Sequence, residues 1–137
     1  MKLIDMQSGK AAGFTFSATR PDKLGATEYT LVSVVTDRTG SVSHFAKELL
    51  AMKRAVVEAC QKSPRAAYLL LRQIEFNTRV TEIHGFAELA AIDPAAYVVP
   101  TTGGMTALYD ATMAAVSATN AYAKKLADAD FGVNAIA

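Results

Sequence analysis

The 137-residue sequence contains only one cysteine, so Cys60 cannot form a disulfide within the chain. The N-terminal stretch, MKLIDMQSGK, lacks the continuous apolar character of a secretory signal. Proteins with free cysteine and no such signal belong by default to a reducing compartment. The sequence therefore predicts a cytoplasmic protein.

Charge of one sign is equally scarce. The sequence has 14 Lys and Arg residues against 13 Asp and Glu residues, a formal net charge of +1, with no long run of either sign. This balance excludes a broad electrostatic surface for nucleic acid or an anionic membrane. The longest apolar run, residues 66–71, ends at Arg72 and is far shorter than the roughly 20 residues of a membrane span. We therefore expect neither a nucleic-acid nor a membrane partner.

The length allows one globular domain. At 137 residues, 51% of them hydrophobic and 20% charged, the chain can build one core but hardly two. Residues 1–28 are rich in glycine and threonine and include one short alternating stretch, residues 14–17, typical of an edge strand or a loosely attached arm. We therefore divide the chain into an N-terminal extension or arm, residues 1–28, and a domain over residues 29–137.

Strands are predicted in three places. The run YTLVSVV, residues 29–35, is mostly apolar and β-branched, as in a strand buried on both faces of a parallel sheet. Residues 67–76 and 79–83 predict two further strands, separated by the turn-forming pair Asn77-Thr78. These two strands are predicted to form an antiparallel hairpin at the edge of the sheet.

Helices are predicted between and after these strands. The first begins near His44 and ends near Ser63-Pro64, and a brief one opens at Asp93-Pro94. A long alanine-rich helix is predicted over residues 106–127. The stripe predicted to be buried on the first helix consists of Phe45, Leu49, Met52 and Val56.

Together these elements predict an α/β fold. Its expected form is a Rossmann-like, open, mostly parallel sheet with helices on both faces and one antiparallel edge hairpin. Ligands of such sheets bind in the crevice beyond the carboxyl ends of the strands. The loop after Val35 is therefore the first place to search for a site.

That loop reads Asp37-Arg38-Thr39-Gly40-Ser41. One carboxylate and two hydroxyls alternate in a tight turn, and Gly40 removes the side chain that would obstruct it. A hard cation such as Mg²⁺ or Mn²⁺ prefers this oxygen-rich surrounding. A second loop, Gly103-Gly104-Met105-Thr106, places another hydroxyl at the start of the long helix. The predicted metal ligands are Asp37, Thr39, Ser41 and Thr106.

These two motifs resemble those of the von Willebrand factor A and integrin inserted-domain family. In that family a metal-ion-dependent adhesion site begins with D-x-S-x-S after the first strand. Asp37, Thr39 and Ser41 match this element, with threonine in place of the first serine. The stretch GGMTALYDA, residues 103–111, is similar to the family's Gly-Gly-x-Thr segment and assigns the metal-binding threonine to Thr106. The resemblance covers residues 29–137 and implies metal-dependent binding of a protein partner through its exposed Asp or Glu, without catalysis.

The sequence departs from the family at its C-terminal end. The family's further acidic element, usually Thr-Asp-Gly after the next central strand, has no counterpart, because residues 131–137 correspond to the beginning of that strand. A six-stranded version needs on the order of 180 residues. We therefore interpret the chain as a truncated domain, and a sheet completed by another chain is the alternative.

Other functions compete with this interpretation. Asp37, Thr39 and Ser41 also fit a local turn that caps the following helix, in which case the protein is a structural or assembly protein with a degenerate metal site. The loop also resembles the D-x-D-G-T-x pattern of haloacid-dehalogenase phosphatases, with Asp37 as nucleophile. However, Thr39 stands where that chemistry needs a second carboxylate.

Several further residues favour ordinary roles. Asp110 fits the positive end of a helix dipole, and His44 and His84 have no partner at metal-ligand spacing. Cys60 is typical of a small core residue. Arg38, at the variable position of the loop, is predicted to be solvated and available to a carboxylate.

Overall fold

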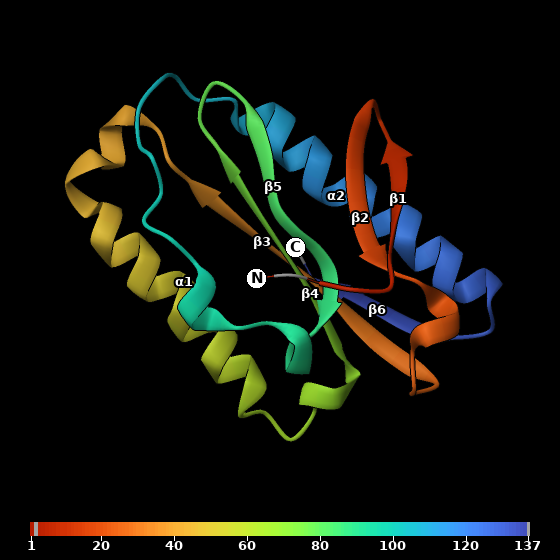
Figure 1. Cartoon of the computed structure of the whole chain (residues 1–137). Coiled ribbons are helices and arrows are strands. Elements are labelled where there is room, and N and C mark those ends of the chain that lie inside the picture. Colours follow the sequence, from red (N-terminus) through yellow and green to blue (C-terminus); the bar gives the residue numbers. More distant parts are fainter. Residues whose placement is uncertain (2, 137) are drawn as a thin grey trace.

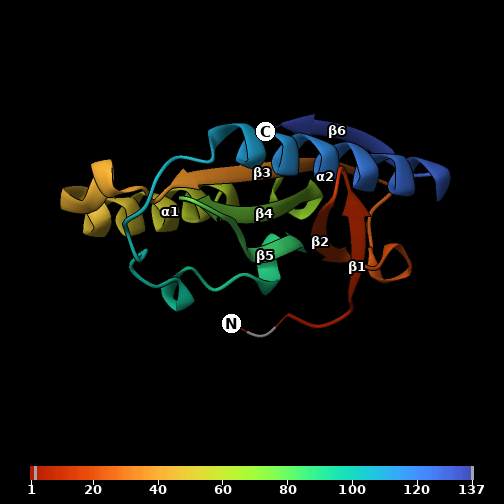
Figure 2. The same cartoon turned by 90° about the horizontal axis from the view of Figure 1, so that it is seen from above.

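The computed structural model describes residues 1 and 3–136, which form a curled sheet with two α-helices packed against it (Figures 1 and 2). The strands are β1 (Met6–Ala11), β2 (Phe14–Thr19), β3 (Glu28–Asp37), β4 (Leu69–Phe76), β5 (Val80–Glu88) and β6 (Gly132–Ile136). The α-helices are α1 (Ala46–Gln61) and α2 (Leu108–Asp128). Short 3-10 helices are η1 (Pro21–Lys23), η2 (Gly40–Phe45), η3 (Ala66–Tyr68), η4 (Leu89–Ala91) and η5 (Pro94–Ala96).

The six strands form one mixed sheet in the order β1-β2-β5-β4-β3-β6. The strands β4, β3 and β6 run parallel, whereas β4 pairs with β5 and β1 pairs with β2 in antiparallel fashion. The predicted Rossmann-like, mostly parallel sheet with helices on both faces is therefore wrong. Hairpins replace the strand-helix-strand units on one half of the sheet, so six strands are accompanied by only two α-helices in the described residues.

The predicted position of the hairpin at the sheet edge is also wrong. The antiparallel pairing of β4 with β5 is confirmed, but β5 lies inside the sheet because β2 packs along it. A Cβ added to Gly85 would lie only 1.9 Å from the Ser17 carbonyl oxygen. Gly85 therefore permits the close approach of β2 to β5. The residue types of β4 and β5 alone do not predict this third strand.

The N-terminal hairpin β1–β2 contributes to the core. Phe16 and Ala18 of β2 are buried, and Ala18 is in register with Phe86 of β5. In Figure 2 the hairpin runs across the direction of β3 and β4, which is where the sheet curls. The division at residue 28 into an arm and a domain stays a prediction.

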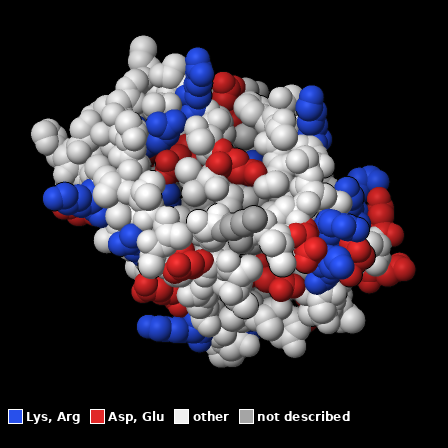
Figure 3. Space-filling model, in the orientation of Figure 1, with Lys and Arg blue, Asp and Glu red and all other residues white. Residues whose placement is uncertain are grey.

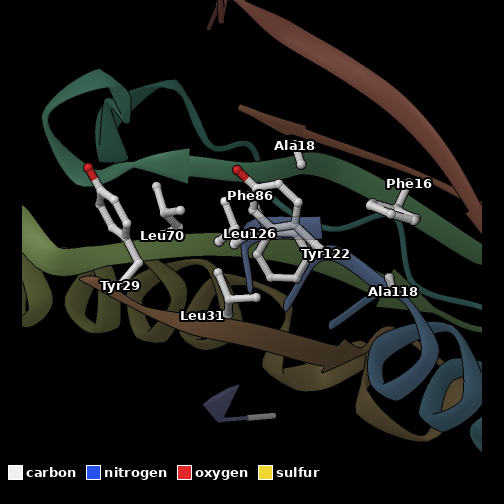
Figure 4. Packing of buried hydrophobic residues seen from close by; sticks show 9 residues of the cluster. All are labelled: Phe16, Ala18, Tyr29, Leu31, Leu70, Phe86, Ala118, Tyr122 and Leu126. Atoms are coloured by element: carbon white, nitrogen blue, oxygen red, sulfur yellow. The ribbon is translucent and has the colours of Figure 1, made fainter. Parts of the chain in front are cut away.

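The central strand β3 matches the predicted strand 29–35 and places its side chains alternately on two sides. Leu31 packs with Tyr122 and Leu126 of α2, and Ser33 shares a hydrogen bond of 2.8 Å with Thr119 of the same helix. The alternate residues of β3 pack in the cluster that contains Val57 of α1. Figure 4 shows the α2-side core, in which the Phe86 and Tyr122 rings stack with centroids 5.2 Å apart.

The helix α1 confirms the predicted span but not the predicted stripe. Phe45 and Met52 are 58% and 51% exposed, while Lys53 and Val57 are buried. Arg54 donates to the carbonyls of Pro94 (3.0 Å) and Tyr97 (2.9 Å). Gln61 likewise donates to the carbonyls of Leu89 and Ile92. Polar side chains of α1 thus face the irregular segment 89–97, because the carbonyl groups of this segment need hydrogen-bond donors. The buried face of α1 is therefore shifted by one residue from the predicted stripe.

The expectation of an edge strand or loose arm at residues 14–17 is wrong, because β2 lies between β1 and β5. Two other local predictions agree with the structure. Asp93 accepts a hydrogen bond of 3.0 Å from the amide of Ala95 and opens the short helix η5. The helix α2 occupies nearly the predicted range. On the face seen in Figure 3, basic and acidic side chains are interspersed. No helix among residues 1 and 3–136 has both the length and the apolar character to cross a membrane.

Candidate functional site

The loop after β3 gathers three oxygen-bearing side chains in one turn. Asp37 ends the strand, and its Oδ1 accepts a hydrogen bond of 2.8 Å from the amide of Thr39. The hydroxyls of Thr39 and Ser41 are hydrogen-bonded at 2.9 Å. Thr39 is only 2% exposed, whereas Ser41 is open to solvent. The Asp37 contact is the local turn that the capping interpretation predicts, but Thr39 makes no side-chain cap to the helix η2.

The second predicted loop lies directly against the first. The amide of Gly103 donates to the carbonyl of Arg38 at 3.0 Å, and the amide of Gly40 donates to the carbonyl of Gly104 at 3.3 Å. Gly103 and Gly104 have φ angles of 144° and 76°, which side-chain-bearing residues rarely adopt. Two glycines are therefore needed for the loop to make both contacts.

Thr106 is positioned through its two neighbours. The amide of Met105 donates to Thr78 Oγ1 at 3.2 Å, and the amide of Ala107 donates to the carbonyl of Asn77 at 2.7 Å. The β4–β5 turn therefore anchors the loop that carries Thr106. From the sequence this turn is predicted only to connect two strands, because its support of the second loop depends on long-range contacts.

The structure brings the four predicted ligands to the same end of the sheet in two adjoining loops (Figure 1). Asp37, Thr39 and Ser41 share one turn, and Thr106 is exposed on the neighbouring loop. No group of three or more His, Cys, Asp or Glu side chains is arranged to hold a metal within the described part of the chain. Any metal at this end would depend mainly on hydroxyl oxygens.

The side chain of Arg38 is fixed by hydrogen bonds within the protein and is not freely solvated. Its guanidinium donates to the Thr101 carbonyl and to Thr81 Oγ1, both at 3.1 Å. Its Nε lies 3.9 Å from Glu75 Oε1, and the side chain is 17% exposed. The expectation of a freely solvated arginine is therefore wrong, because Arg38 ties the first loop to β5 and to the segment before Gly103.

A buried polar cluster under α1 was not foreseen from the sequence. Lys53 forms an ion pair with Glu75, and its Nζ lies 5.2 Å from the centroid of the Tyr97 ring. Burial raises the pKa of Tyr97 to about 12, so its hydroxyl is protonated at neutral pH. It donates to His84 Nε2 at 2.6 Å, and His84 Nδ1 then donates to the Gly85 carbonyl at 2.9 Å. The signal in the sequence was Arg72-Gln73 and Glu75 inside an otherwise apolar strand.

The buried histidine predicts a pH-dependent stability. Burial lowers the pKa of His84, because it penalises the charged imidazolium, so the unfolded chain takes up this proton at a higher pH than the folded protein does. Keeping His84 neutral in the folded protein therefore costs no stability above about pH 6.5. As the pH falls below this value, the free energy of unfolding decreases by at most about 1.4 kcal/mol per pH unit for one proton.

The measurement is urea unfolding followed by circular dichroism at about pH 7.5 and about pH 5.5. We expect His84→Gln to be less sensitive to acid than the wild type. His44→Gln serves as the matched control, since it removes an exposed imidazole on η2. Equal acid sensitivity in the wild type and His84→Gln would contradict the prediction.

The other singled-out residues have simple surroundings. Asp110 lies in the first turn of α2, where a carboxylate is favoured by the helix dipole. Cys60 is partly buried against the α1-side core, and burial raises the pKa of its thiol. A raised thiol pKa reduces the thiolate fraction, so Cys60 is a poor nucleophile.

No family model matches the chain, and no curated protein matches it either.

Proposed function

We propose that the chain is a divalent-cation-dependent protein-binding module of the adhesion type, in which Asp37, Thr39, Ser41 and Thr106 hold Mg²⁺ or Mn²⁺ for an acidic partner side chain. The observation that carries the proposal is the backbone join between the two loops. Gly103 and Gly40 each donate one hydrogen bond across it, of 3.0 and 3.3 Å. This join supports a site made by both loops, as the resemblance to the von Willebrand factor A family implies.

The donor set of the first loop fits a hard octahedral cation. Neighbouring ligands of an octahedral ion with bonds of about 2.05 Å are separated by about 2.9 Å. The Thr39 and Ser41 hydroxyl oxygens are 2.9 Å apart. They would need only to exchange their mutual hydrogen bond for the ion, while the Asp37 carboxylate keeps one oxygen on the Thr39 amide. Little rearrangement of the turn is therefore required.

The residues of the site divide the work between them. A bound cation would supply the positive charge that attracts a partner's carboxylate. The neutral hydroxyls of Thr39, Ser41 and Thr106 leave most of that charge uncancelled, while Asp37 fixes the turn through the Thr39 amide.

Exposed hydrophobic side chains border both loops along the chain. Phe45, which follows the first loop, is 58% exposed. Met105 and Tyr109, beside Thr106, are 81% and 77% exposed, and Leu108 is 58% exposed. Large apolar groups around a polar centre are typical of surfaces that dock another protein. Their position supports a protein as the partner of the cation, in preference to a small metabolite.

The proposal predicts that Asp37→Ala and Thr106→Ala each weaken Mg²⁺ and Mn²⁺ binding by about tenfold or more, the equivalent of about 1.4 kcal/mol. Isothermal titration of the purified chain measures this directly. Asp128→Ala and Thr27→Ala are matched controls, because Asp128 is exposed at the C-terminal end of α2 and Thr27 is exposed before the start of β3, whereas the two loops precede α2 and follow β3. Unchanged metal affinity in both site variants would remove the proposal.

The free edge of β6 favours a second candidate function, a structural role in assembly. In the described residues β6 pairs only with β3, and most of its residues are exposed. An unpaired edge of this kind can accept a strand from another chain, including one that completes the sheet. Assembly measured by light scattering that is unaffected by a chelator would support this role.

Hydrolysis of a generic phosphate ester that Asp37→Asn abolishes would instead support the phosphatase alternative.

A further inference from the structure

A cavity of about 650 Å³ lies at the end of the sheet opposite to the two loops. The segment before β3, the last turn of α1, the short helix η3 and the end of β5 line it. Half of its lining residues are glycine or alanine, and Tyr68 and Leu89 add larger apolar surface. Cavities of several hundred cubic ångströms with mostly apolar walls are typical of small-molecule sites.

Glu88 brings a carboxylate to this cavity. It is in register with Leu70 of β4, which is in turn in register with Leu31 of β3. Side chains two residues apart on a strand share one side of the sheet, so Glu88 lies on the side of Phe86. Tyr29, at the end of the same core, also lines the cavity (Figure 4). Glu88 is only half-buried, so its carboxylate is accessible from the cavity.

The charge of Glu88 is not neutralised by the cations around it. Arg65 pairs with Glu28 at 3.4 Å, and its guanidinium lies over the Tyr68 ring, 5.3 Å from the centroid. Lys23 and Glu88 line a neighbouring cavity together, but no ion pair joins them. A partly buried carboxylate without a cation is less favourable than one with a cation beside it. A positively charged ligand would supply this partner.

The second polar side chain of the cavity, Gln61, also offers an acceptor. Its amide nitrogen donates to the carbonyls of Leu89 at 3.0 Å and Ile92 at 2.9 Å, which uses both of its hydrogens. The amide oxygen is left to accept. The Tyr29 hydroxyl already accepts a hydrogen bond of 2.9 Å from the Ala26 amide. Glu88 and Gln61 together therefore suit a ligand group that donates several hydrogen bonds.

We propose that this cavity binds an organic ammonium ion with a flat apolar body, an arylalkylamine in size and shape, whose ammonium group pairs with Glu88. The small alanine and glycine side chains leave room for a ring, and Tyr68 offers an aromatic surface to it. None of these residues is one of the four predicted metal ligands. The proposal therefore adds a second ligand at the other end of the molecule.

The test compares three ligands that share a phenylethyl body and differ in charge. Phenethylamine is the probe, phenethyl alcohol is its neutral counterpart, and hydrocinnamate is its anionic counterpart. Binding to the full chain is measured by methyl chemical shifts in NMR in the presence of EDTA. Phenethylamine is expected to shift the methyl signals of Ala66 and Leu89, which line the cavity, and to leave that of Met105, on the second loop, unchanged.

Phenethyl alcohol and hydrocinnamate are expected to bind at least about tenfold more weakly, because neither supplies a cation to Glu88. Equal binding of the alcohol would show that only the apolar walls act. Tighter binding of hydrocinnamate would show that Arg65 or Lys23 dominates the cavity. Either result, or no shift with phenethylamine, would overturn the proposal.

Variants then test the carboxylate. Glu88→Gln should weaken phenethylamine binding by about tenfold or more and leave the affinity for phenethyl alcohol unchanged. Glu48→Gln is the matched control, since Glu48 is exposed in the first turn of α1, whereas the cavity lies at the last turn. Unchanged phenethylamine affinity in Glu88→Gln would overturn the proposal. The three-ligand comparison on the wild type is decisive if this variant fails to fold.

The cavity and the metal site are tested separately. Phenethylamine binding in EDTA by a chain that binds no Mg²⁺ would support the cavity proposal and remove the metal site. Magnesium binding by a chain that does not bind phenethylamine would overturn the cavity proposal and support the metal site.

Discussion

Replacing Gly85 with alanine is expected to cost about 3 kcal/mol of unfolding free energy or more, the upper part of the range for forced overpacking. The added Cβ would lie 1.9 Å from the Ser17 carbonyl oxygen and 2.2 Å from its carbonyl carbon, which are backbone atoms that cannot rotate away. The strand β2 must therefore move off β5. This movement would also break the hydrogen bonds of Ser17 with Glu82, of which the hydroxyl one is 2.6 Å long.

Gly25→Ala is the matched control for this experiment. A Cβ at Gly25 meets no atom within 4 Å, and its backbone is not in the left-handed region. We expect a change within about 0.5 kcal/mol, as at ordinary surface positions. Urea unfolding followed by far-ultraviolet circular dichroism suits this protein, which has no tryptophan. A Gly85→Ala variant as stable as Gly25→Ala would contradict the packing of β2 against β5.

Breaking the buried ion pair under α1 is expected to have a comparable effect. Glu75→Gln leaves Lys53, which is 2% exposed, without its carboxylate. Removing one partner of a buried pair typically costs about 3–5 kcal/mol, because the remaining charge is uncompensated. Lys53→Met should cost less, since Arg38 Nε stays 3.9 Å from the Glu75 carboxylate and compensates part of its charge.

The double variant Lys53→Met with Glu75→Gln separates this explanation from a general loss of packing. We expect its destabilisation to be smaller than the sum of the two single changes by about 2 kcal/mol, because neither Lys53 nor Glu75 is left as an unpaired buried charge. The measurement is the full double-mutant cycle in urea. Strictly additive effects would show that the two side chains do not interact in solution.

Much of the local structure follows from the sequence, whereas the sheet order does not. The β-branched run at residues 29–35 and the alanine-rich helix predict β3 and α2, since their periodicity reflects burial. The inclusion of β2 depends on Gly85, a single long-range contact that no periodic pattern reports. The rotation of α1 has a similar cause, because Arg54 faces inward to satisfy the carbonyls of Pro94 and Tyr97.

The candidate site was likewise predictable only where it depends on local sequence. The spacing of Asp37, Thr39 and Ser41 within one turn is local, and the structure places them as neighbours. The support of the second loop by Asn77 and Thr78 depends on the position of the β4–β5 turn, which only the assembled sheet defines. The buried ion pair under α1 was not predicted, because Lys53 and Glu75 are recognised as partners only when α1 is placed on β4.

The join between the two loops has a consequence for how this surface can change over evolution. Its hydrogen bonds connect main-chain atoms of Arg38, Gly40, Gly103 and Gly104, so their formation does not require any particular side chain at the exposed positions nearby. Substitutions at Phe45, Met105 or Tyr109 can therefore change the apolar surface beside the loops while the spacing of the loops is preserved. The backbone framework and the exposed side chains of this end of the molecule are free to diverge separately.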